Sequence, residues 1–546
     1  MRAPTITFDH PTSNTVGALE PLRIMVGPAT RGLAVDVRLD GVPVVAAVRP
    51  GTDQAFVNAW CDTRDQAPGL HRLDVIATLP DGTSSAVSRY LSVVVGEPAH
   101  LPPVLPSSDA APVVVRCDDP GLDAALAATA GGGVATVVLS PGAELAPGAL
   151  EWLGHNLAAT SGIDVAIGDE ASRLSPTRWL RWRKLAFQPE ALPELDQVGP
   201  LLGVGPRAAR VLVAARPEGW AGASPYAMAL ELIDHGLATL AAGRVLTLTP
   251  EARLPVDDEV GRDAVRRLAE RRGRPVEIAR GRREGLRSVR WPLAVQRGVT
   301  VVVPSRTRAL AAECLAALAD RTTHPDLEVV LVDSSREGLD DLTCTLPLTH
   351  VRYPVGTPFN YQLAVNLGTR HARPDHDVLY LNDDAFPLDD PSWLTRMQEL
   401  LSLPQVGIVG ALLRYADGRV QHGGVAWLEG SAHRYHDAPA DTPGRHFDLL
   451  VPGNPEAVSG ACLLARREVL DQLDGHDESY VHLYGDVDLC FRAVAAGWRI
   501  AWCATAELEH RESTTYKDDV NDDDQHLFLT TWGRDRDTSH VRRVRS

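Results

Sequence analysis

This chain of 546 residues has few cysteines and no long apolar run. Its 7 Cys are scattered, form no Cys-X-X-Cys pair and lie mostly within apolar stretches. Such usage argues against a zinc site or a disulfide framework and is typical of a reducing compartment. No stretch approaches the roughly 18 uninterrupted apolar residues of a membrane span, and the first residues have no apolar signal core. We therefore expect no transmembrane segment and a cytoplasmic location.

Basic residues are also scarce relative to acidic ones. The chain has 54 Lys and Arg against 71 Asp and Glu, a formal net charge of −17. Because nucleic-acid phosphates require basic surfaces, a nucleic-acid partner is not expected. The same charge disfavours an electrostatic hold on anionic lipids. It is still compatible with peripheral association at the inner face of a membrane.

The length predicts about three domains, and the patterning differs along the chain. Residues 1–98 contain short alternating strands, such as 22–26 and 34–39, separated by turns such as Asp40-Gly41. This pattern predicts a β-sandwich, and the segment 68–78 resembles a strand of bacterial Ig-like domains. Residues 99–112 are rich in proline and predict a semi-rigid linker.

The C-terminal region begins with a strand–helix–strand unit. Apolar residues 299–303 predict one strand, a helical pattern follows, and residues 327–333 predict a second strand that ends in Asp333. A right-handed βαβ crossover in a mostly parallel sheet is expected.

A further apolar strand, 377–381, runs directly into Asp383 and Asp384. Open α/β sheets bind ligands at the carboxyl ends of their strands, so both carboxylates are expected at a site. Paired Asp there suits a divalent cation that holds a diphosphate. A solvated Asn-Asp-Asp turn is the alternative.

A helix is predicted to start near residue 485, with Asp486 and Asp488 in its first turn. Acidic residues at this place complement the helix dipole, so a capping role is the alternative to a catalytic one. The pattern ends at Gly497, and a strand over 498–503 and then His510 follow.

These motifs, taken together and in order, resemble the inverting family-2 glycosyltransferases of the GT-A fold, especially the bacterial branch that transfers rhamnose or galactofuranose. The matching pieces are Val302-Val-Pro-Ser-Arg-Thr-Arg308, Val329-Val-Leu-Val-Asp333, Phe359-Asn-Tyr361 with Asn366, Leu381-Asn-Asp-Asp384, Asp417-Gly-Arg-Val-Gln-His-Gly-Gly424, Ser459-Gly-Ala-Cys-Leu463, Asp486-Val-Asp-Leu-Cys490 and Glu509-His510. The resemblance covers roughly residues 296–535 and implies a catalytic GT-A domain, Rossmann-like, over 286–546.

The resemblance implies a role for each motif residue. Contacts with a nucleotide-diphosphate sugar of the UDP or TDP type are implied for Pro304, Arg308, Asp333, Asn366 and Asp383. Binding of Mn or Mg is implied for Asp384 and His510, and the role of general base for Asp486.

Other implied positions lie on the acceptor side or its loops. Gly460 would keep a loop close to the substrate, and Asp488 and Trp427 are further candidates there. His433 and His436 are either acceptor contacts or ordinary loop residues. One departure from the family is Gly485, because the family usually has Glu, Asn or Asp before the base.

The chemistry gives separate reasons for these residue types. An inverting sugar transfer is an in-line displacement that needs one base for the acceptor hydroxyl. A carboxylate of ordinary pKa is ionised at pH 7 and can serve as that base. The leaving diphosphate gains negative charge, which a divalent cation can neutralise.

Residues 113–285 resemble the second half of another family-2 domain from which the motif residues are missing. The segment Ser140-Pro-Gly-Ala143 stands where the metal pair would be, and no carboxylate is present near Tyr226 and Ala227. We expect a degenerate GT-A-like domain without turnover; an unrelated α/β domain is the alternative.

The expected function is metal-dependent, inverting transfer of a sugar to a cell-surface glycan or a lipid-linked glycan. A non-catalytic carbohydrate-binding scaffold is the alternative from another class. A sugar-nucleotide pyrophosphorylase is disfavoured, because those enzymes have a Gly-rich, Lys-containing loop where this chain has Pro304 to Arg308.

Overall fold

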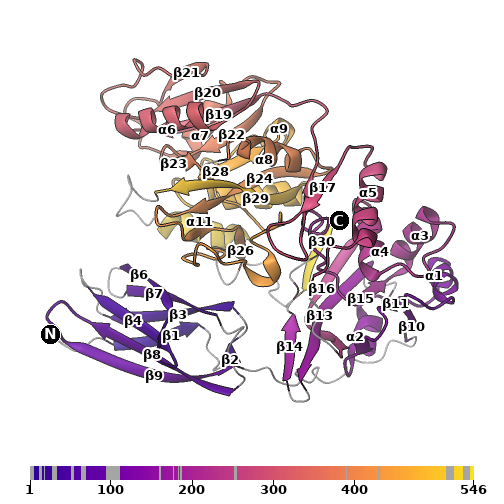
Figure 1. The fold of residues 1–546 in the computed structure, drawn as a ribbon. Coiled ribbons are helices and arrows are strands. Elements are labelled where there is room, and N and C mark those ends of the chain that lie inside the picture. Colours follow the sequence, from indigo (N-terminus) through magenta and orange to yellow (C-terminus); the bar gives the residue numbers. More distant parts are fainter. Residues whose placement is uncertain are drawn as a thin grey trace.

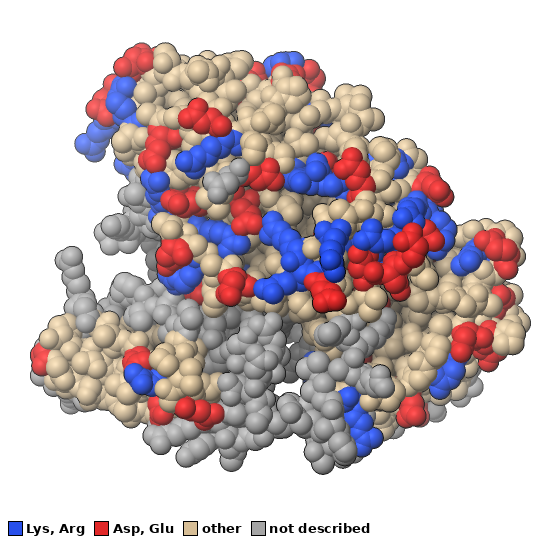
Figure 2. All heavy atoms as spheres, viewed as in Figure 1, with Lys and Arg blue, Asp and Glu red and all other residues tan. Residues whose placement is uncertain are grey.

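The computed structural model describes residues 5–10, 15–16, 19–27, 33–50, 55–62, 69–93, 111–158, 162–175, 178–182, 184, 187–250, 255–388, 390–427, 431–511, 522–532 and 541–545 (Figure 1). No helix in these ranges combines the length and the hydrophobicity that crossing a membrane needs. On the face shown in Figure 2, acidic side chains lie among the basic ones. Among the described residues, Arg266 pairs with both Glu259 and Asp263.

The N-terminal region forms two sheets. The first has the order β1 (Thr5–His10), β3 (Leu19–Gly27), β7 (Ala55–Asp62) and β6 (Val45–Pro50). The second has the order β2 (Thr15–Val16), β9 (Ser84–Val93), β8 (Gly69–Thr78), β4 (Ala34–Leu39) and β5 (Val42–Pro43). One hydrophobic cluster takes Ile24 and Val57 from the first sheet and Val37 and Val75 from the second.

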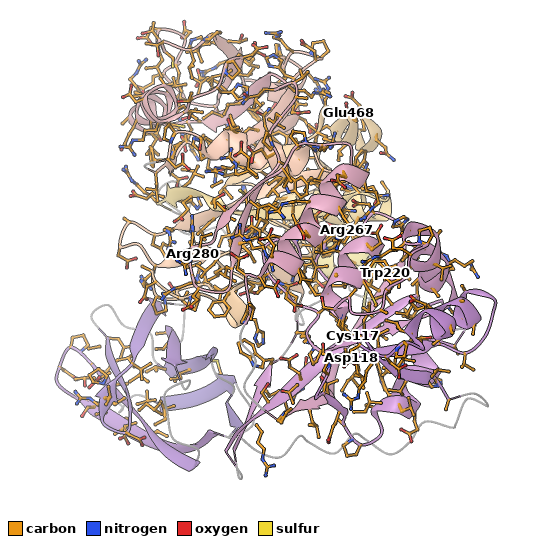
Figure 3. All side chains as sticks on the ribbon, turned by 45° about the vertical axis from the view of Figure 1, so that its right-hand side comes forward. Cys117, Asp118, Trp220, Arg267, Arg280 and Glu468 are labelled. Carbon is orange, nitrogen blue, oxygen red and sulfur yellow. The ribbon has the colours of Figure 1, made fainter. Side chains whose placement is uncertain are left out.

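The middle region has a mixed sheet with helices. Its strand order is β10 (Val113–Arg116), β11 (Thr136–Leu139), β15 (Leu201–Val204), β13 (Val165–Ser175), β16 (Ala238–Thr249) and β12 (Glu144–Leu145), with β14 (Arg178–Trp182) beside β13 and β30 (Val541–Arg545) beside β16. Its helices are α1 (Leu122–Ala130), α2 (Ala149–Asn156), α3 (Pro206–Ala215), α4 (Pro225–Leu232) and α5 (Glu259–Arg271). The loop that carries Trp220 is attached to the end of β10, because Gly222 N–H donates to Cys117 O at 2.7 Å (Figure 3).

The C-terminal region is built on a sheet of the order β21 (Leu348–Arg352), β20 (Leu327–Asp333), β19 (Val299–Ser305), β22 (Asp377–Leu381), β28 (Cys462–Ala465), β24 (Val406–Arg414), β29 (Arg499–His510) and β23 (Ala385–Pro387), with β25 (Val420–His422) beside β24. Its helices are α6 (Arg308–Arg321), α7 (Tyr361–Thr369), α8 (Trp393–Leu401), α9 (Arg467–Leu473), α10 (Gly485–Ala495), α11 (Asp522–Trp532) and the 3-10 turn η1 (Arg445–Phe447). A small hairpin joins β26 (Val425–Trp427) and β27 (Ser431–His433).

The strands predicted over 299–303, 327–333 and 377–381 are confirmed, and β19 pairs in parallel with both β20 and β22. The strand predicted over 498–503 is wrong in length, because β29 continues to His510. A register shift between Ala411 and Leu412 lets β29 keep pairing with β24 beyond Cys503. This continuation brings His510 to the edge of the sheet where β22 ends.

The sheets of the middle and C-terminal regions share one pairing scheme. In the middle sheet, β11 pairs antiparallel with β15, β15 pairs antiparallel with β13, and β13 pairs parallel with β16. In the C-terminal sheet, β22 pairs antiparallel with β28, β28 pairs antiparallel with β24, and β24 pairs parallel with β29. The turns after β11 and β22 also match. Ser140 N–H donates to Pro200 O and Asn382 N–H to Ala461 O, at 2.9 and 3.1 Å.

By this correspondence, Asp383 and Asp384 occupy the turn positions that Pro141 and Gly142 hold in the middle region. The middle sheet has no counterparts of β20 and β21 on its described path.

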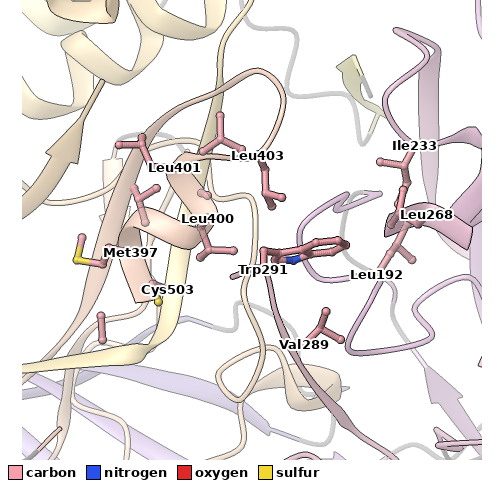
Figure 4. Packing of buried hydrophobic residues seen from close by; sticks show 14 of the residues in the cluster. Leu192, Ile233, Leu268, Val289, Trp291, Met397, Leu400, Leu401, Leu403 and Cys503 are labelled. Atoms are coloured by element: carbon pink, nitrogen blue, oxygen red, sulfur yellow. The ribbon is translucent and has the colours of Figure 1, made fainter. Parts of the chain in front are cut away.

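The middle and C-terminal regions are joined through a common core. Trp291, only 3% exposed, follows β18 (Arg287–Arg290), which pairs with β17 (Glu277–Arg280). Its ring lies between Leu400 and Leu403 on one side and Leu192 and Leu268 on the other (Figure 4). The buried Arg499 also donates across this boundary to Glu190 at 2.7 Å.

Candidate active site

Two carboxylates follow the fully buried strand β22. Asp384 is 7% exposed, and Asp383 Oδ2 accepts a hydrogen bond from Ser305 Oγ at 2.5 Å. Burial raises the pKa of Asp383 to about 6; the bond from Ser305 opposes this shift, and the negative charge of Asp384 adds to it. A bound cation would favour the charged form of both groups.

His510 lies beside Asp384 because β23 and β29 pair with Ala385 opposite His510. His510 Nε2 is 3.2 Å from Asp384 Oδ1, and Nδ1 is 2.7 Å from Gln421 Oε1. An amide oxygen only accepts, so this assignment puts the ring proton on Nδ1 and turns the Nε2 lone pair toward Asp384. This is the arrangement in which a histidine can ligate a metal, with Gln421 orienting the ring.

The carboxylate of Asp384 is a ligand that Mn and Mg prefer, and the imidazole of His510 is one that divalent transition metals take. The structure holds no group of three or more His, Cys, Asp or Glu side chains placed for a metal among the residues it describes.

Asp486 stands at the start of α10 and is half-buried. Its Oδ2 accepts from Gly460 N–H at 2.7 Å and its Oδ1 from Val487 N–H at 2.8 Å. Burial raises the pKa of Asp486 above its ordinary value, and the two N–H donors oppose that shift. A Cβ at position 460 would lie 3.3 Å from the Asp486 Cβ, so glycine allows the loop this close approach.

Tyr361, the first residue of α7, links the two groups of carboxylates. Its hydroxyl donates to Asn382 Oδ1 at 2.9 Å and lies 3.4 Å from Gly460 O. Burial raises the pKa of this hydroxyl, and the charges of Asp486 and Asp384 raise it further. Tyr361 thus contacts both the turn that leads to Asp384, a predicted metal ligand, and the loop that donates to Asp486, the predicted base.

The glycine before Asp486 is explained by its neighbour on α7. A Cβ on Gly485 would lie 2.2 Å from Gln362 Cδ, so the Gln362 side chain fills the space of the missing one. Gln362 is 1% exposed, and its Oε1 has no hydrogen-bond partner among the described residues. Neither Tyr361 nor Gln362 was assigned a role from sequence: Tyr361 is the last residue of the Phe-Asn-Tyr motif, and Gln362 follows it.

Two of the residues predicted for the nucleotide sugar, Pro304 and Asp333, lie at the ends of β19 and β20, where Ser305 is paired with Asp333. Asp333 accepts from the N–H groups of Ser335 and Leu339 at 2.8 and 2.9 Å and pairs with Arg352. Although burial opposes it, these hydrogen bonds hold the pKa of Asp333 below its ordinary value. Pro304 is buried on β19, one residue from this pair.

Arg308 opens α6 and pairs with Asp341 at 2.6 Å, on the loop beyond Asp333. The side chain of Asn366 contacts a different segment of the chain. Its Nδ2 donates to His476 O at 2.8 Å and to Glu478 Oε1 at 3.0 Å, and its Oδ1 accepts from His476 N–H. Asn366 therefore holds the segment 475–478, and its contact with a donor stays a prediction.

Asp488 points away from Asp486. It pairs with Arg492 at 2.7 Å, accepts from Trp532 Nε1 at 2.9 Å and is 2% exposed. These contacts join α10 to α11, and an acceptor contact by Asp488 stays a prediction. The side chain of Trp427 lies outside the described part of the chain.

Parts of this chain are similar to known proteins. Residues 296–523 match the family model described as "Glycosyltransferase like family 2". An uncharacterized protein y4gI of Sinorhizobium fredii is 31% identical over 324 residues, 56% of this chain and 35% of that protein. The O-antigen biosynthesis protein RfbC of Myxococcus xanthus is 30% identical over 352 residues, 61% of this chain and 27% of its own length.

An N-acetylglucosaminyl-diphospho-decaprenol L-rhamnosyltransferase of Mycobacterium tuberculosis is 33% identical over 125 residues, 21% of this chain and 41% of that enzyme. The chain thus covers 27 to 41% of the length of these curated relatives. A solved structure of GalNAc-T7 with UDP, GalNAc and Mn2+ is similar over 40% of this chain and 45% of its own, with 13% identity and a TM-score of 0.34. The matched residues 296–523 contain Asp384, Asp486 and His510.

Proposed function

We propose that the protein is a metal-dependent, inverting glycosyltransferase that moves a sugar from a UDP- or TDP-type donor to a cell-surface glycan or lipid-linked glycan. The observation that carries this proposal is that Tyr361 contacts the turn before Asp384, which lies beside His510, and also the loop at Gly460 that donates to Asp486. The names of the O-antigen and rhamnosyltransferase relatives support an acceptor of this kind. We propose a cytoplasmic location, compatible with association at the inner face of the membrane.

In the proposed reaction, Asp486 takes the proton of the acceptor hydroxyl as its oxygen attacks the anomeric carbon. The nucleoside diphosphate leaves from the opposite face, so the anomeric configuration inverts. The N–H of Gly460 holds the Asp486 carboxylate in one orientation. Burial raises its pKa, which makes the carboxylate a stronger base than an exposed one.

Asp384 and His510 would hold Mn or Mg. The cation supplies positive charge against the charge that develops on the leaving diphosphate. Gln421 keeps the Nε2 lone pair of His510 available for it. Asp383, Pro304, Arg308 and Asp333 would contact the sugar and the nucleoside.

We also propose that residues 113–285 are a glycosyltransferase-like domain without turnover. Its sheet shares the pairing scheme of the C-terminal region, yet Pro141 and Gly142 stand at the positions of Asp383 and Asp384. Prolines and glycines have no ligand atoms in their side chains. A spacer or interaction role for the sheets of residues 1–98 belongs to the same proposal.

Nucleotide release tests the main proposal. Purified protein is incubated with UDP- and TDP-sugars and lipid-linked acceptors, with Mn or with EDTA. We expect Mn-dependent release that disappears in Asp384→Asn and persists in Asp375→Asn, an exposed carboxylate before β22. Folded protein that binds glycans yet releases no nucleotide with any donor would favour the scaffold.

Binding is tested separately by thermal shift with nucleoside diphosphates and Mn. A ligand at about 100 times its Kd stabilises a protein by about 2.7 kcal/mol. We expect a shift that requires both the nucleotide and Mn and is absent in Asp384→Asn.

A further inference from the structure

Two successive backbone N–H groups donate to two different side chains beside the proposed base. Ser459 N–H donates to His422 Nε2 at 3.2 Å, and Gly460 N–H donates to Asp486 Oδ2 at 2.7 Å. His422 ends β25 and is 0% exposed. Because the two amides are adjacent, a histidine that fixes Ser459 also limits how the Gly460 amide can rotate away from Asp486.

The first of these bonds determines where the proton of His422 lies. An Nε2 that accepts from Ser459 carries no hydrogen, so the neutral ring has its proton on Nδ1. His422 Nδ1 is 2.8 Å from His433 Nδ1. Two ring nitrogens at this distance share one hydrogen, so His422 donates and His433 accepts. The proton of neutral His433 is then on its own Nε2.

The surroundings keep His422 neutral. Burial lowers its pKa well below the ordinary value, and the positive charges that His433, His510, Arg434 and His436 carry or can carry lower it further. Two carboxylates lie near these groups: Asp448 pairs with Arg434, and Asp437 is 3.6 Å from His436. His433, at the end of β27, is exposed, so it is the member of the pair that water can protonate.

Protonation of His433 conflicts with this chain of hydrogen bonds. An imidazolium has hydrogens on both nitrogens, so His433 Nδ1–H would face His422 Nδ1–H. The contact is restored only if the proton of His422 moves to Nε2, and that hydrogen would then face Ser459 N–H. In either case one bond of the chain is lost.

We propose that His422 and His433 are positioning residues for the sugar transfer: the neutral pair holds the Ser459–Gly460 segment on Asp486, and protonation of His433 weakens this hold, because one bond of the chain is lost. This inference rests on the proposed function for its effect on rate. Loss of the Gly460 donor would also remove a bond that opposes the raised pKa of Asp486.

Two substitutions of His422 separate its two contacts. In His422→Gln, the amide oxygen can replace Nε2 as the acceptor for Ser459. In His422→Asn, the shorter amide can replace Nδ1–H toward His433 but does not reach Ser459. We expect kcat to fall about tenfold in His422→Asn and less than threefold in His422→Gln, with the donor KM unchanged in both. Equal losses, or a larger loss in His422→Gln, would overturn the inference.

The pH profile tests the role of His433. His433→Asn keeps an acceptor for His422 but cannot titrate, so the acidic limb of kcat should move to lower pH. The control is His155→Asn, an exposed histidine of α2, whose profile should match that of the native protein. An unmoved acidic limb in His433→Asn would contradict the proposal.

A spectroscopic measurement decides the inference without any turnover. In protein labelled with 15N-histidine, the resonance lost in His422→Asn should show the Nδ1–H tautomer and stay neutral from pH 8 to pH 5. The amide signals of Ser459 and Gly460 should shift as His433 titrates. An Nε2–H tautomer of His422 would refute the hydrogen-bond chain. Absence of sugar transfer with these signals present would instead refute only the proposed function.

Discussion

The side chain of Gln362 on α7 occupies the space in which a side chain at position 485 would lie. A Cβ on Gly485 would be 2.2 Å from Gln362 Cδ and 2.5 Å from its Oε1. Two residues that are remote in the sequence therefore depend on each other directly beside the proposed base. The glycine that departs from the family pattern has a structural reason in this protein.

This dependence predicts a rescue. Gly485→Ala should destabilise the fold by about 1–3 kcal/mol, because the added methyl group forces Gln362 or α10 to move. The start of α10 carries Asp486, so kcat should fall as well. The double variant that combines Gly485→Ala with Gln362→Ala should recover most of the lost stability and most of the lost kcat. Urea unfolding and nucleotide release in the four-member mutant cycle measure this, and additive losses would contradict it.

Removal of the proposed base should separate activity from stability. Asp486→Asn should reduce transfer about 100-fold or more, the usual contribution of a general base. Because burial raises the folded pKa of Asp486, its ionised form weakens the fold at neutral pH. This destabilisation is absent below the pKa that Asp486 has in the unfolded chain, and it grows as pH rises from there through the folded pKa. Thermal melts should therefore show the variant at least as stable as the native protein at pH 8, with a difference that shrinks toward pH 4.

Gln421 should influence metal affinity although it is not itself a proposed metal ligand, because it contacts the proposed ligand His510. In Gln421→Leu, His510 Nδ1–H loses its 2.7 Å acceptor, and the ring is free to turn or change tautomer. Loss of such a partner typically costs about 10- to 100-fold in metal affinity. The Mn concentration for half-maximal thermal shift in the presence of UDP should rise by that factor. Gln472→Leu, on the exposed surface of α9, is the control and should leave it unchanged.

Buried carboxylates of the middle region should affect stability rather than chemistry. Asp169 accepts from Arg181 Nη2 at 2.7 Å and from Lys184 N–H at 2.8 Å, and Glu170 pairs with Lys184 at 3.2 Å. Alanine at either position should cost roughly 1–3 kcal/mol, because buried donors lose their acceptors. Transfer should stay measurable at temperatures where the variants are folded. A loss as complete as that in Asp384→Ala would assign catalysis to the middle region.

Much of the C-terminal fold could be predicted from local patterns. The apolar runs that end at Asp333 and at Leu381 are strands, and the helix predicted near residue 485 starts there. Strands with two buried faces and helices with acidic first turns are recognised from neighbouring residues alone. The prediction for 498–503 was too short, since the continuation of β29 depends on a bulge in its pairing with β24.

The sequence by itself therefore determined which carboxylates end strands, which open a helix, and in what order the motifs follow. Only the tertiary structure decided that Tyr361 joins Asp486 to the turn of Asp384, that Gln362 replaces a side chain at 485, and that His422 reaches Ser459. The physical reason is range: a strand or helix is specified by the periodicity of adjacent residues, whereas these contacts arise where separate strands and helices pack together.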